Sequence, residues 1–322
     1  MVESAVQVAG AFGASSLGGG CPAAWAQPGG SGLGRAVVVM ESAAGIDHED
    51  LAAHKITILV GDYEQTTQGN VNHGTKTLGT ICASDNGVGV IRVAPCPSFV
   101  GFANSDFGLS YPDTELQIID NLVTAQLLPG AVIQHALHAG VGPVELTAGM
   151  PPVFQLATAL GGIVVESAGN FPNDFDDSGV ASYYPQLDPT SPKFVDSGAI
   201  MVGGATHTVP HANMFNKGVR VDCHAWAEEV LTTVGSTTQF GFYSGTSAAS
   251  SIIAGVAVAV QGMAAMKFGA PLSPATLRNI FRNSKLGTPS ANPATDKIGS
   301  MPDLRKIVRY FDSLKTSGST LK

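Results

Sequence analysis

Short runs of apolar residues alternate with longer segments of mixed polarity along most of this chain. A continuous apolar run bounded by glycine, proline or polar residues is typical of a strand buried on both faces. Apolar positions that recur every three or four residues are typical of a helix with one buried side. The expected strands are residues 35–40, 56–60, 88–93, 144–147, 162–165, 199–202 and 219–221. The expected helices are residues 76–83, 116–128, 131–139, 154–160, 252–260, 273–282 and 302–311.

This alternation of strands and helices predicts an α/β fold with a mainly parallel sheet. The sequence contains 39 glycines and only 13% charged residues, which suits buried parallel strands joined by tight turns. At 322 residues the chain is near the upper size for one hydrophobic core. We therefore expect an irregular N-terminal arm at residues 1–34 and a single domain at residues 35–322.

Charge and hydropathy narrow the classes of partner. The net charge of −8 argues against nucleic acid or an anionic membrane as the main partner. No apolar run reaches the roughly 18 residues of a membrane-spanning helix, because the best candidate, after Ser251, is broken at Gln261. The first residues lack the basic start and long apolar run of a signal peptide, so that segment was removed or never existed. The four cysteines lack Cys-x-x-Cys spacing. They could form two disulfides or remain reduced thiols in the core, and the sequence therefore leaves the cellular compartment undecided.

Residues 243–251 carry the strongest chemical signal, because small and hydroxyl side chains lead directly into the apolar stretch 252–260. A sharp turn into a buried helix presents a hydroxyl at the helix N-terminus, where free N–H groups favour developing negative charge. Ser247 is therefore a candidate nucleophile. The alternative is that Thr246 or Ser247 only caps a core helix.

Three short motifs resemble those of the subtilisin-like serine peptidases. They are His-Gly-Thr at 73–75, Ser-Ala-Gly-Asn at 167–170 and Gly-Thr-Ser at 245–247. The order of acid, histidine and serine along the chain is also the subtilisin order. The resemblance is gap-free at its anchor residues from 41 to 95 and covers most of residues 35–310. It implies a three-layer α/β fold, with a mainly parallel twisted sheet and helices on both faces.

The resemblance also implies a role for each motif residue. Ser247 is expected to attack a carbonyl carbon, and His73 is expected to take its proton and return it to the leaving group. The side-chain amide of Asn170 and the N–H of Ser247 are expected to hold the oxyanion. Taken alone, a histidine at a helix start is more often a structural, capping residue than a base.

The chain departs from the family pattern at the acid, where Glu41 replaces the usual aspartate. A bacterial branch of the family resembles this chain in having glutamate there, followed by His-Glu-Asp-Leu as at 48–51. Asp62, which also follows an expected strand, and Asp47 are the competing acids. Ser251 is a second departure, because the family usually has proline there to pre-set the first helical turn.

The same resemblance implies a structural calcium site. Asp50 and Asn86 are expected to be side-chain ligands, and Ser84, Val88 and Val90 to supply carbonyl oxygens, because calcium prefers oxygen clusters. The alternative is an Asn-Gly turn, with Asp50 capping a short helix.

The sequence indicates less about substrate binding than about catalysis. The stretches that resemble the first specificity pocket are Thr147, Ala148, Gly149, Ser167, Ala168 and Gly169. Acidic residues nearby would favour basic substrates, unless they form only a solvated loop; they are Glu166, Asp174, Asp176 and Asp177.

The resemblance implies a monomeric serine endopeptidase that acts on polypeptides through an acyl-enzyme. Two alternatives stay open: acyl transfer to an amine, as in peptide ligation or cyclisation, and an inactive subtilase fold that binds peptides.

Overall fold

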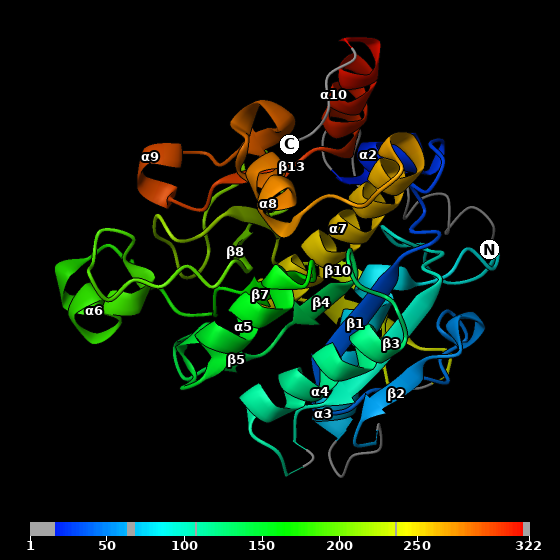
Figure 1. Ribbon diagram of the computed structural model, residues 1–322, viewed down its shortest axis with the longest axis horizontal. Coiled ribbons are helices and arrows are strands. Elements are labelled where there is room, and N and C mark those ends of the chain that lie inside the picture. Colours follow the sequence, from blue (N-terminus) through cyan, green and yellow to red (C-terminus); the bar gives the residue numbers. More distant parts are fainter. Residues whose placement is uncertain (1–16, 63–67, 107, 236, 318–322) are drawn as a thin grey trace.

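A nine-stranded sheet forms the centre of the protein, as a computed structural model of residues 17–62, 68–106, 108–235 and 237–317 describes it (Figure 1). The strand order is β12-β13-β9-β8-β7-β4-β1-β3-β2, and every neighbouring pair is parallel except β12 with β13. The strands are β1 (Ala36–Glu41), β2 (Thr57–Val60), β3 (Phe99–Asn104), β4 (Val132–His135), β7 (Ile163–Ser167), β8 (Ile200–Ala205), β9 (Cys223–Trp226), β12 (Gly287–Pro289) and β13 (Ser300–Pro302). Two small hairpins pair β5 (His138–Ala139) with β6 (Gly142–Pro143), and β10 (Val230–Thr233) with β11 (Phe240–Tyr243).

Helices cover both faces of this sheet, so the expected three-layer α/β fold is confirmed. In β1, Val37 and Val39 point into the core shared with α7, whereas Val38 and Met40 point into the core under α4 and α5. This alternation is the two-residue period of a strand buried on both faces. The helices are α2 (Leu17–Trp25), α3 (Gln68–Cys82), α4 (Tyr111–Thr124), α5 (Met150–Ala159), α6 (Ser178–Tyr183), α7 (Thr246–Phe268), α8 (Pro274–Arg282), α9 (Pro293–Asp296) and α10 (Leu304–Ser317), with short 3₁₀ turns at Ala52–His54, Val144–Leu146, Pro185–Leu187 and Ser284–Leu286.

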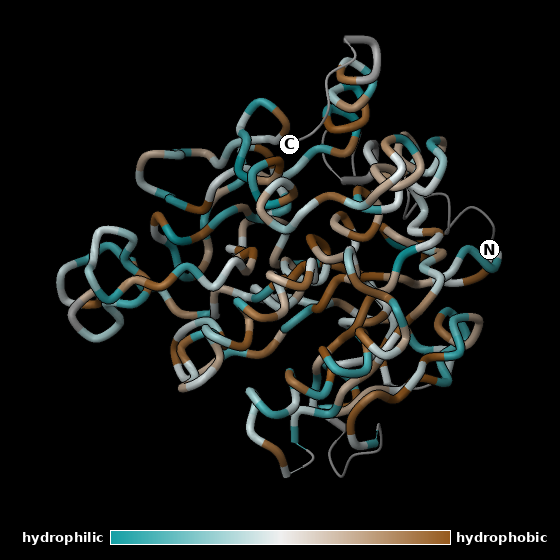
Figure 2. The backbone as a smooth tube through the Cα atoms, in the orientation of Figure 1, coloured by the Kyte–Doolittle hydropathy of each residue, from teal (hydrophilic) through white to brown (hydrophobic). Residues whose placement is uncertain are grey.

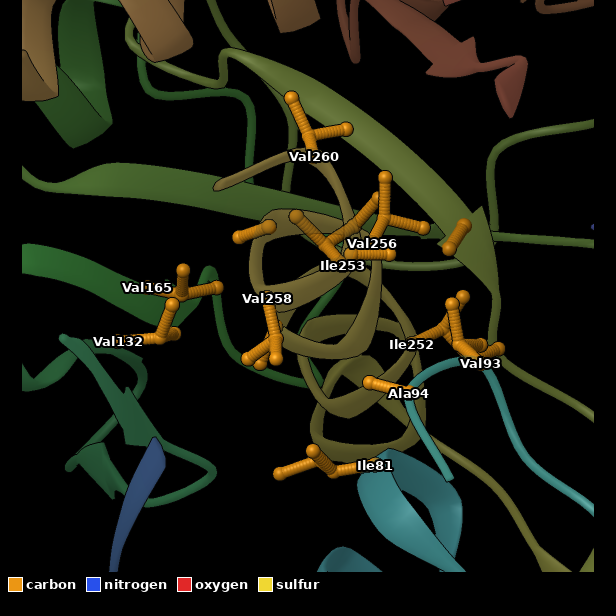
Figure 3. Close-up of a cluster of buried hydrophobic side chains, with 14 of the residues drawn as sticks. Ile81, Val93, Ala94, Val132, Val165, Ile252, Ile253, Val256, Val258 and Val260 are labelled. Carbon is orange, nitrogen blue, oxygen red and sulfur yellow. The ribbon is translucent and has the colours of Figure 1, made fainter. Parts of the chain in front are cut away.

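The long helix α7 is the centre of the larger core. Its valine and isoleucine side chains radiate toward Val132 and Val165 of the sheet and toward Ile81 of α3 (Figure 3). Among the described residues α7 alone is long and apolar enough to cross a membrane, contrary to the expectation that Gln261 prevents this. However, 89% of its apolar window is buried inside the protein, and the Gln261 amide is satisfied by the backbone of Leu272. Burial in the core of the protein therefore explains why α7 is so apolar.

The hydropathy of the residues along the backbone agrees with this arrangement of a buried sheet and a core helix. Brown, hydrophobic segments lie mostly on the central strands and on α7, and teal segments are common in the peripheral loops (Figure 2). The described part of the expected irregular arm also contributes, because α2 packs against α10 and buries Cys21 and Ala24. All four cysteines are free thiols; Cys96 is exposed and the other three are buried. Burial raises the pKa of Cys21 and Cys82 to about 12, as expected for inert core thiols.

Several expected elements are wrong. Residues 131–139, expected as a helix, form strand β4, a two-residue connection and strand β5. The expected strand at 88–93 is irregular, and the strand falls instead at β3. Residues 144–147 form a 3₁₀ turn, and the strand expected at 219–221 is β9. Short apolar runs have too few periods to separate a strand from a buried helix, and this ambiguity accounts for the errors.

Candidate active site

Three segments far apart in the sequence bring the expected triad to the carboxyl edge of the sheet. Glu41 is the last residue of β1, His73 lies in the second turn of α3, and Ser247 lies in the first turn of α7. The helix α3 begins at Gln68, before His73, and not at residue 76 as the sequence pattern predicts. Gly74 makes the close approach possible, since a Cβ there would lie 1.9 Å from the carbonyl oxygen of Ala43 beside β1.

The carboxylate of Glu41 is the acid that meets the histidine. His73 Nδ1 lies 2.8 Å from Glu41 Oε1 and 3.0 Å from Oε2. Thr77, one turn further along α3, donates its hydroxyl to Glu41 Oε1 at 2.8 Å. Asp62 instead accepts a hydrogen bond from the Asn104 side chain, and Asp47 is exposed. Glutamate therefore reaches the imidazole from the position where the family pattern has aspartate.

His73 has a raised pKa. Burial acts to lower it, but the charge of Glu41 and the hydrogen bond to it outweigh burial, while Lys76 opposes them weakly. The His73 side chain is still 38% exposed, so a substrate can reach it from the pocket, whereas Glu41 is only 1% exposed. A buried carboxylate that holds a reachable imidazole is the arrangement that orients a general base.

The hydroxyl of Ser247 is hydrogen-bonded to the backbone in this structure. Its Oγ donates to the carbonyl oxygen of Ala136 at 2.7 Å. Its backbone oxygen accepts from Ser251 Oγ at 2.7 Å, so the serine in place of proline ties the first turns of the helix together. Ser247 is 4% exposed and has to rotate before its hydroxyl can meet His73.

Hydrogen bonds to its side-chain oxygen fix the orientation of Asn170. The Oδ1 atom accepts from the N–H of Thr246 at 2.7 Å and from its hydroxyl at 2.9 Å, and the Thr246 hydroxyl accepts in turn from the N–H of Gly169. This leaves the side-chain nitrogen of Asn170 as the donor at the site. The N–H of Ser247 lies in the first helical turn, where backbone donors have no partner within the helix. The arrangement offers two donors for an oxyanion.

A pocket of about 310 Å³ joins these groups. Its lining is Glu41, Ser42, Gly69, Asn70, His73, Ala136, Leu137, His138, Asn170 and Ser247. The stretch at 136–138 was missed in the sequence because it was assigned to a helix. Thr147, Ala148 and Gly149 lie between a 3₁₀ turn and α5 and are not part of this lining, so their role in a specificity pocket stays a prediction.

Residues 167–169 hold two parts of the pocket lining, Leu137 and Asn170, in place. Ser167 Oγ donates to the carbonyl oxygen of Leu137 at 2.8 Å, which fixes one wall. Ala168 is fully buried, and its carbonyl oxygen accepts from Asn216 Nδ2 at 2.7 Å. Gly169 adopts φ +96°, a left-handed conformation that glycine adopts without strain, and this turn leads the chain to Asn170.

A sequence match to the subtilase family spans residues 34–303. The chain belongs to the subtilase family. Among curated subtilases, subtilisin E from Bacillus subtilis (strain 168) is 26% identical over 234 residues, which cover 70% of this chain and 54% of that protein. M-protease from Shouchella clausii (strain KSM-K16) is 27% identical over 229 residues, covering 71% and 53%. This subtilase thus spans about half the length of these relatives.

Two solved structures show the same fold. The prenylagaramide maturation protease PagA aligns with a TM-score of 0.64 and 18% identity, over 94% of this subtilase and 99% of that chain. A cold adapted subtilisin-like serine proteinase aligns with a TM-score of 0.59 and 20% identity, over 85% and 89%. The expected family and fold are therefore both confirmed.

The acidic residues near the site of this subtilase have partners of their own. Lys297 pairs with Asp174 and Asp176 at 3.2 and 3.0 Å, and Lys217 also reaches Asp174. Asp177 caps α6, and Glu166 is fully buried beside Arg220. Three of the four carboxylates are thus paired with basic side chains of this chain, which does not support a preference for basic substrates.

The five residues of the expected calcium site do meet, but their donors do not fit a calcium shell. Asp50 Oδ2 accepts from the N–H of Val90 at 2.9 Å, and Oδ1 accepts from Asn86 Nδ2 at 3.2 Å. Asn86 Oδ1 accepts from the N–H of Val88, and Ser84 Oγ lies 3.0 Å from His54 Nε2. Two hydrogen-bond donors thus occupy the Asp50 carboxylate oxygens that a calcium ion would need. This hydrogen bonding supports the alternative, a turn organised by Asp50, and no step below depends on calcium.

We predict that calcium does not change the melting temperature of the native protein relative to a chelator. Asp50→Ala is expected to lower the free energy of unfolding by about 2 kcal/mol in either condition, because buried hydrogen bonds to a charged acceptor are lost. Urea unfolding with and without chelator measures both effects, and Asp47→Ala, at an exposed position, is the control. A melting temperature that rises with calcium only when Asp50 is present would instead establish the calcium site.

Proposed function

We propose that this subtilase is a serine endopeptidase that hydrolyses peptide bonds through an acyl-enzyme. The observation that carries the proposal is the contact of His73 Nδ1 with both oxygens of Glu41, beside a pocket that Ser247 and Asn170 also line. The opposite ring nitrogen, Nε2, is then the atom that exchanges a proton with Ser247.

The mechanism follows from these positions. Ser247 Oγ attacks the carbonyl carbon of the peptide while its proton passes to His73 Nε2. The oxyanion accepts hydrogen bonds from the N–H of Ser247 and the side-chain amide of Asn170. His73 then gives the proton to the leaving amine, which breaks the C–N bond and leaves the acyl-enzyme. Water, deprotonated by His73, attacks the ester and restores Ser247. Glu41 holds the ring orientation and stabilises the imidazolium throughout.

Intact-mass labelling with a fluorophosphonate tests this proposal. This reagent forms a covalent phosphonyl ester only with an activated serine, and one adduct per chain is expected on the native protein. The adduct is expected to be absent from Ser247→Ala and retained in Ser244→Ala, whose side chain is exposed in the preceding loop. No adduct on folded native protein would overturn the peptidase and favour the inactive, peptide-binding subtilase.

A second candidate is acyl transfer to an amine rather than to water. Both reactions share the acyl-enzyme and differ only in the acceptor. Mass spectrometry of peptide products with an added amine nucleophile separates them: ligated products indicate transfer, whereas cleaved peptides alone indicate hydrolysis.

A further inference from the structure

Tyr243 occupies the position beside the histidine that the serine hydroxyl needs. It is the last residue of β11, and its side chain is buried, with 3% exposed. Its hydroxyl lies 3.2 Å from His73 Nε2 and 2.9 Å from Thr77 Oγ1. The two rings meet edge to face, with centroids 5.3 Å apart and planes at 90°. Ser247, meanwhile, donates to Ala136.

Counting hydrogen atoms in this cluster fixes its protonation. Thr77 Oγ1 lies 2.8 Å from Glu41 Oε1 and 3.2 Å from the carbonyl oxygen of His73, and both of these oxygens only accept hydrogen bonds. The Thr77 hydrogen is therefore directed to them and not to Tyr243. The contact between Thr77 and Tyr243 then takes the Tyr243 hydrogen. The contact between Tyr243 and His73 can then contain only a hydrogen that is carried by His73 Nε2. A second ring hydrogen, on Nδ1, fills the contact with Glu41.

A ring with both hydrogens is the charged imidazolium. If His73 were neutral and accepted from Tyr243, the 2.9 Å contact between Thr77 and Tyr243 would contain no hydrogen. Two oxygen lone pairs would then face each other in a buried site, which is unfavourable. The charged ring therefore satisfies one more contact of this cluster than the neutral ring does.

Resting on the serine peptidase function, we propose that Tyr243 is a positioning residue that holds His73 in its protonated form and occupies the Nε2 contact that Ser247 needs. His73 becomes a base only after the Nε2 proton is lost to solvent. The Tyr243 contact is then broken, and Ser247 rotates from Ala136 toward Nε2. Tyr243 thereby sets the pH at which the nucleophile is activated.

The charged groups around His73 agree with this arrangement. Glu41 faces the ring from β1 and favours the imidazolium, whereas Lys76 of α3 acts against it. Tyr243 faces it from β11; burial and the charge of Glu41 raise the pKa of its phenol, so the Tyr243 hydrogen is retained. The ring of Tyr243 also carries Lys76 Nζ at 5.9 Å from its centroid.

The test compares Tyr243→Phe with native protein and with Tyr310→Phe, a change in α10. The rate of fluorophosphonate labelling is measured against pH. Tyr243→Phe removes a hydrogen bond to the charged ring of His73. The acidic side of the pH–rate profile is therefore expected to move to lower pH by about one unit. The rate below the native midpoint therefore rises about tenfold, with a similar plateau. An unchanged profile, an upward shift or a rate lowered at all pH values would overturn the proposal.

A readout without catalysis separates this inference from the function it rests on. In the Ser247→Ala background, the ring signals of His73 are followed by NMR as pH is varied. Tyr243→Phe and Thr77→Val are both expected to lower the His73 midpoint, whereas Thr77→Ser, which keeps the donor, leaves it in place. Equal midpoints in all four proteins would overturn the proposal. Absence of labelling in native protein, together with the expected NMR shifts, would overturn only the peptidase function.

Discussion

Replacing Ser247 by alanine is expected to lower turnover of a peptide substrate by about six orders of magnitude. The change removes the only atom that bonds to the carbonyl carbon, so the acyl-enzyme cannot form. The fold should survive, because the lost hydroxyl lies at a helix start, where alanine fits well, and gives up its hydrogen bond to the Ala136 carbonyl oxygen. Initial rates of peptide cleavage, with melting temperature as a folding check, measure the effect.

Ser244→Ala is the matched control for this prediction, since it removes an exposed hydroxyl three residues away. Its turnover is expected to stay within a factor of a few of the native value. Turnover in Ser247→Ala within a hundredfold of native would move the nucleophile elsewhere. Thr246 would then be the first residue to examine, although its hydroxyl is engaged with Asn170.

Replacing Glu41 by glutamine is expected to lower turnover by about four orders of magnitude while the fold is kept. Glutamine has the same shape, but its NH₂ group can donate where the carboxylate only accepts. His73 then loses the partner that holds a hydrogen on Nδ1, and the Nε2 atom is no longer the free base. The charge that raises the pKa of His73 is also removed, so the His73 midpoint in an NMR titration is expected to fall.

Asp62→Asn is the control for the acid, because Asp62 follows a neighbouring strand but contacts Asn104 rather than the histidine. It is expected to leave turnover close to native. Near-native turnover in Glu41→Gln together with a large loss in Asp62→Asn would transfer the role to Asp62. A loss of folding in Glu41→Gln, seen as a lowered melting temperature, is distinguished by measuring both proteins well below that temperature.

The sequence alone determined the fold class, the family and the residues that line up on its motifs. These features are local. The turn into the helix at Ser247 follows from small residues before an apolar run, and Glu41 follows directly on a continuous apolar strand. Because parallel strands end at one edge of a sheet, the strand pattern by itself predicts that such positions converge.

Only the tertiary structure decided the walls of the site and the contacts around His73. The apolar run at 132–135 is too short to separate strand from helix, so the adjoining wall at 136–138 is defined only by the pairing of β4 between β1 and β7. Asp50 shows a second limit, because the same residues suit a calcium shell or a turn until their donors are placed. Tyr243 and His73 are 170 positions apart, and no periodicity or motif links them. Their contact depends on how β11 and α3 pack, which is a property of the folded chain rather than of either segment.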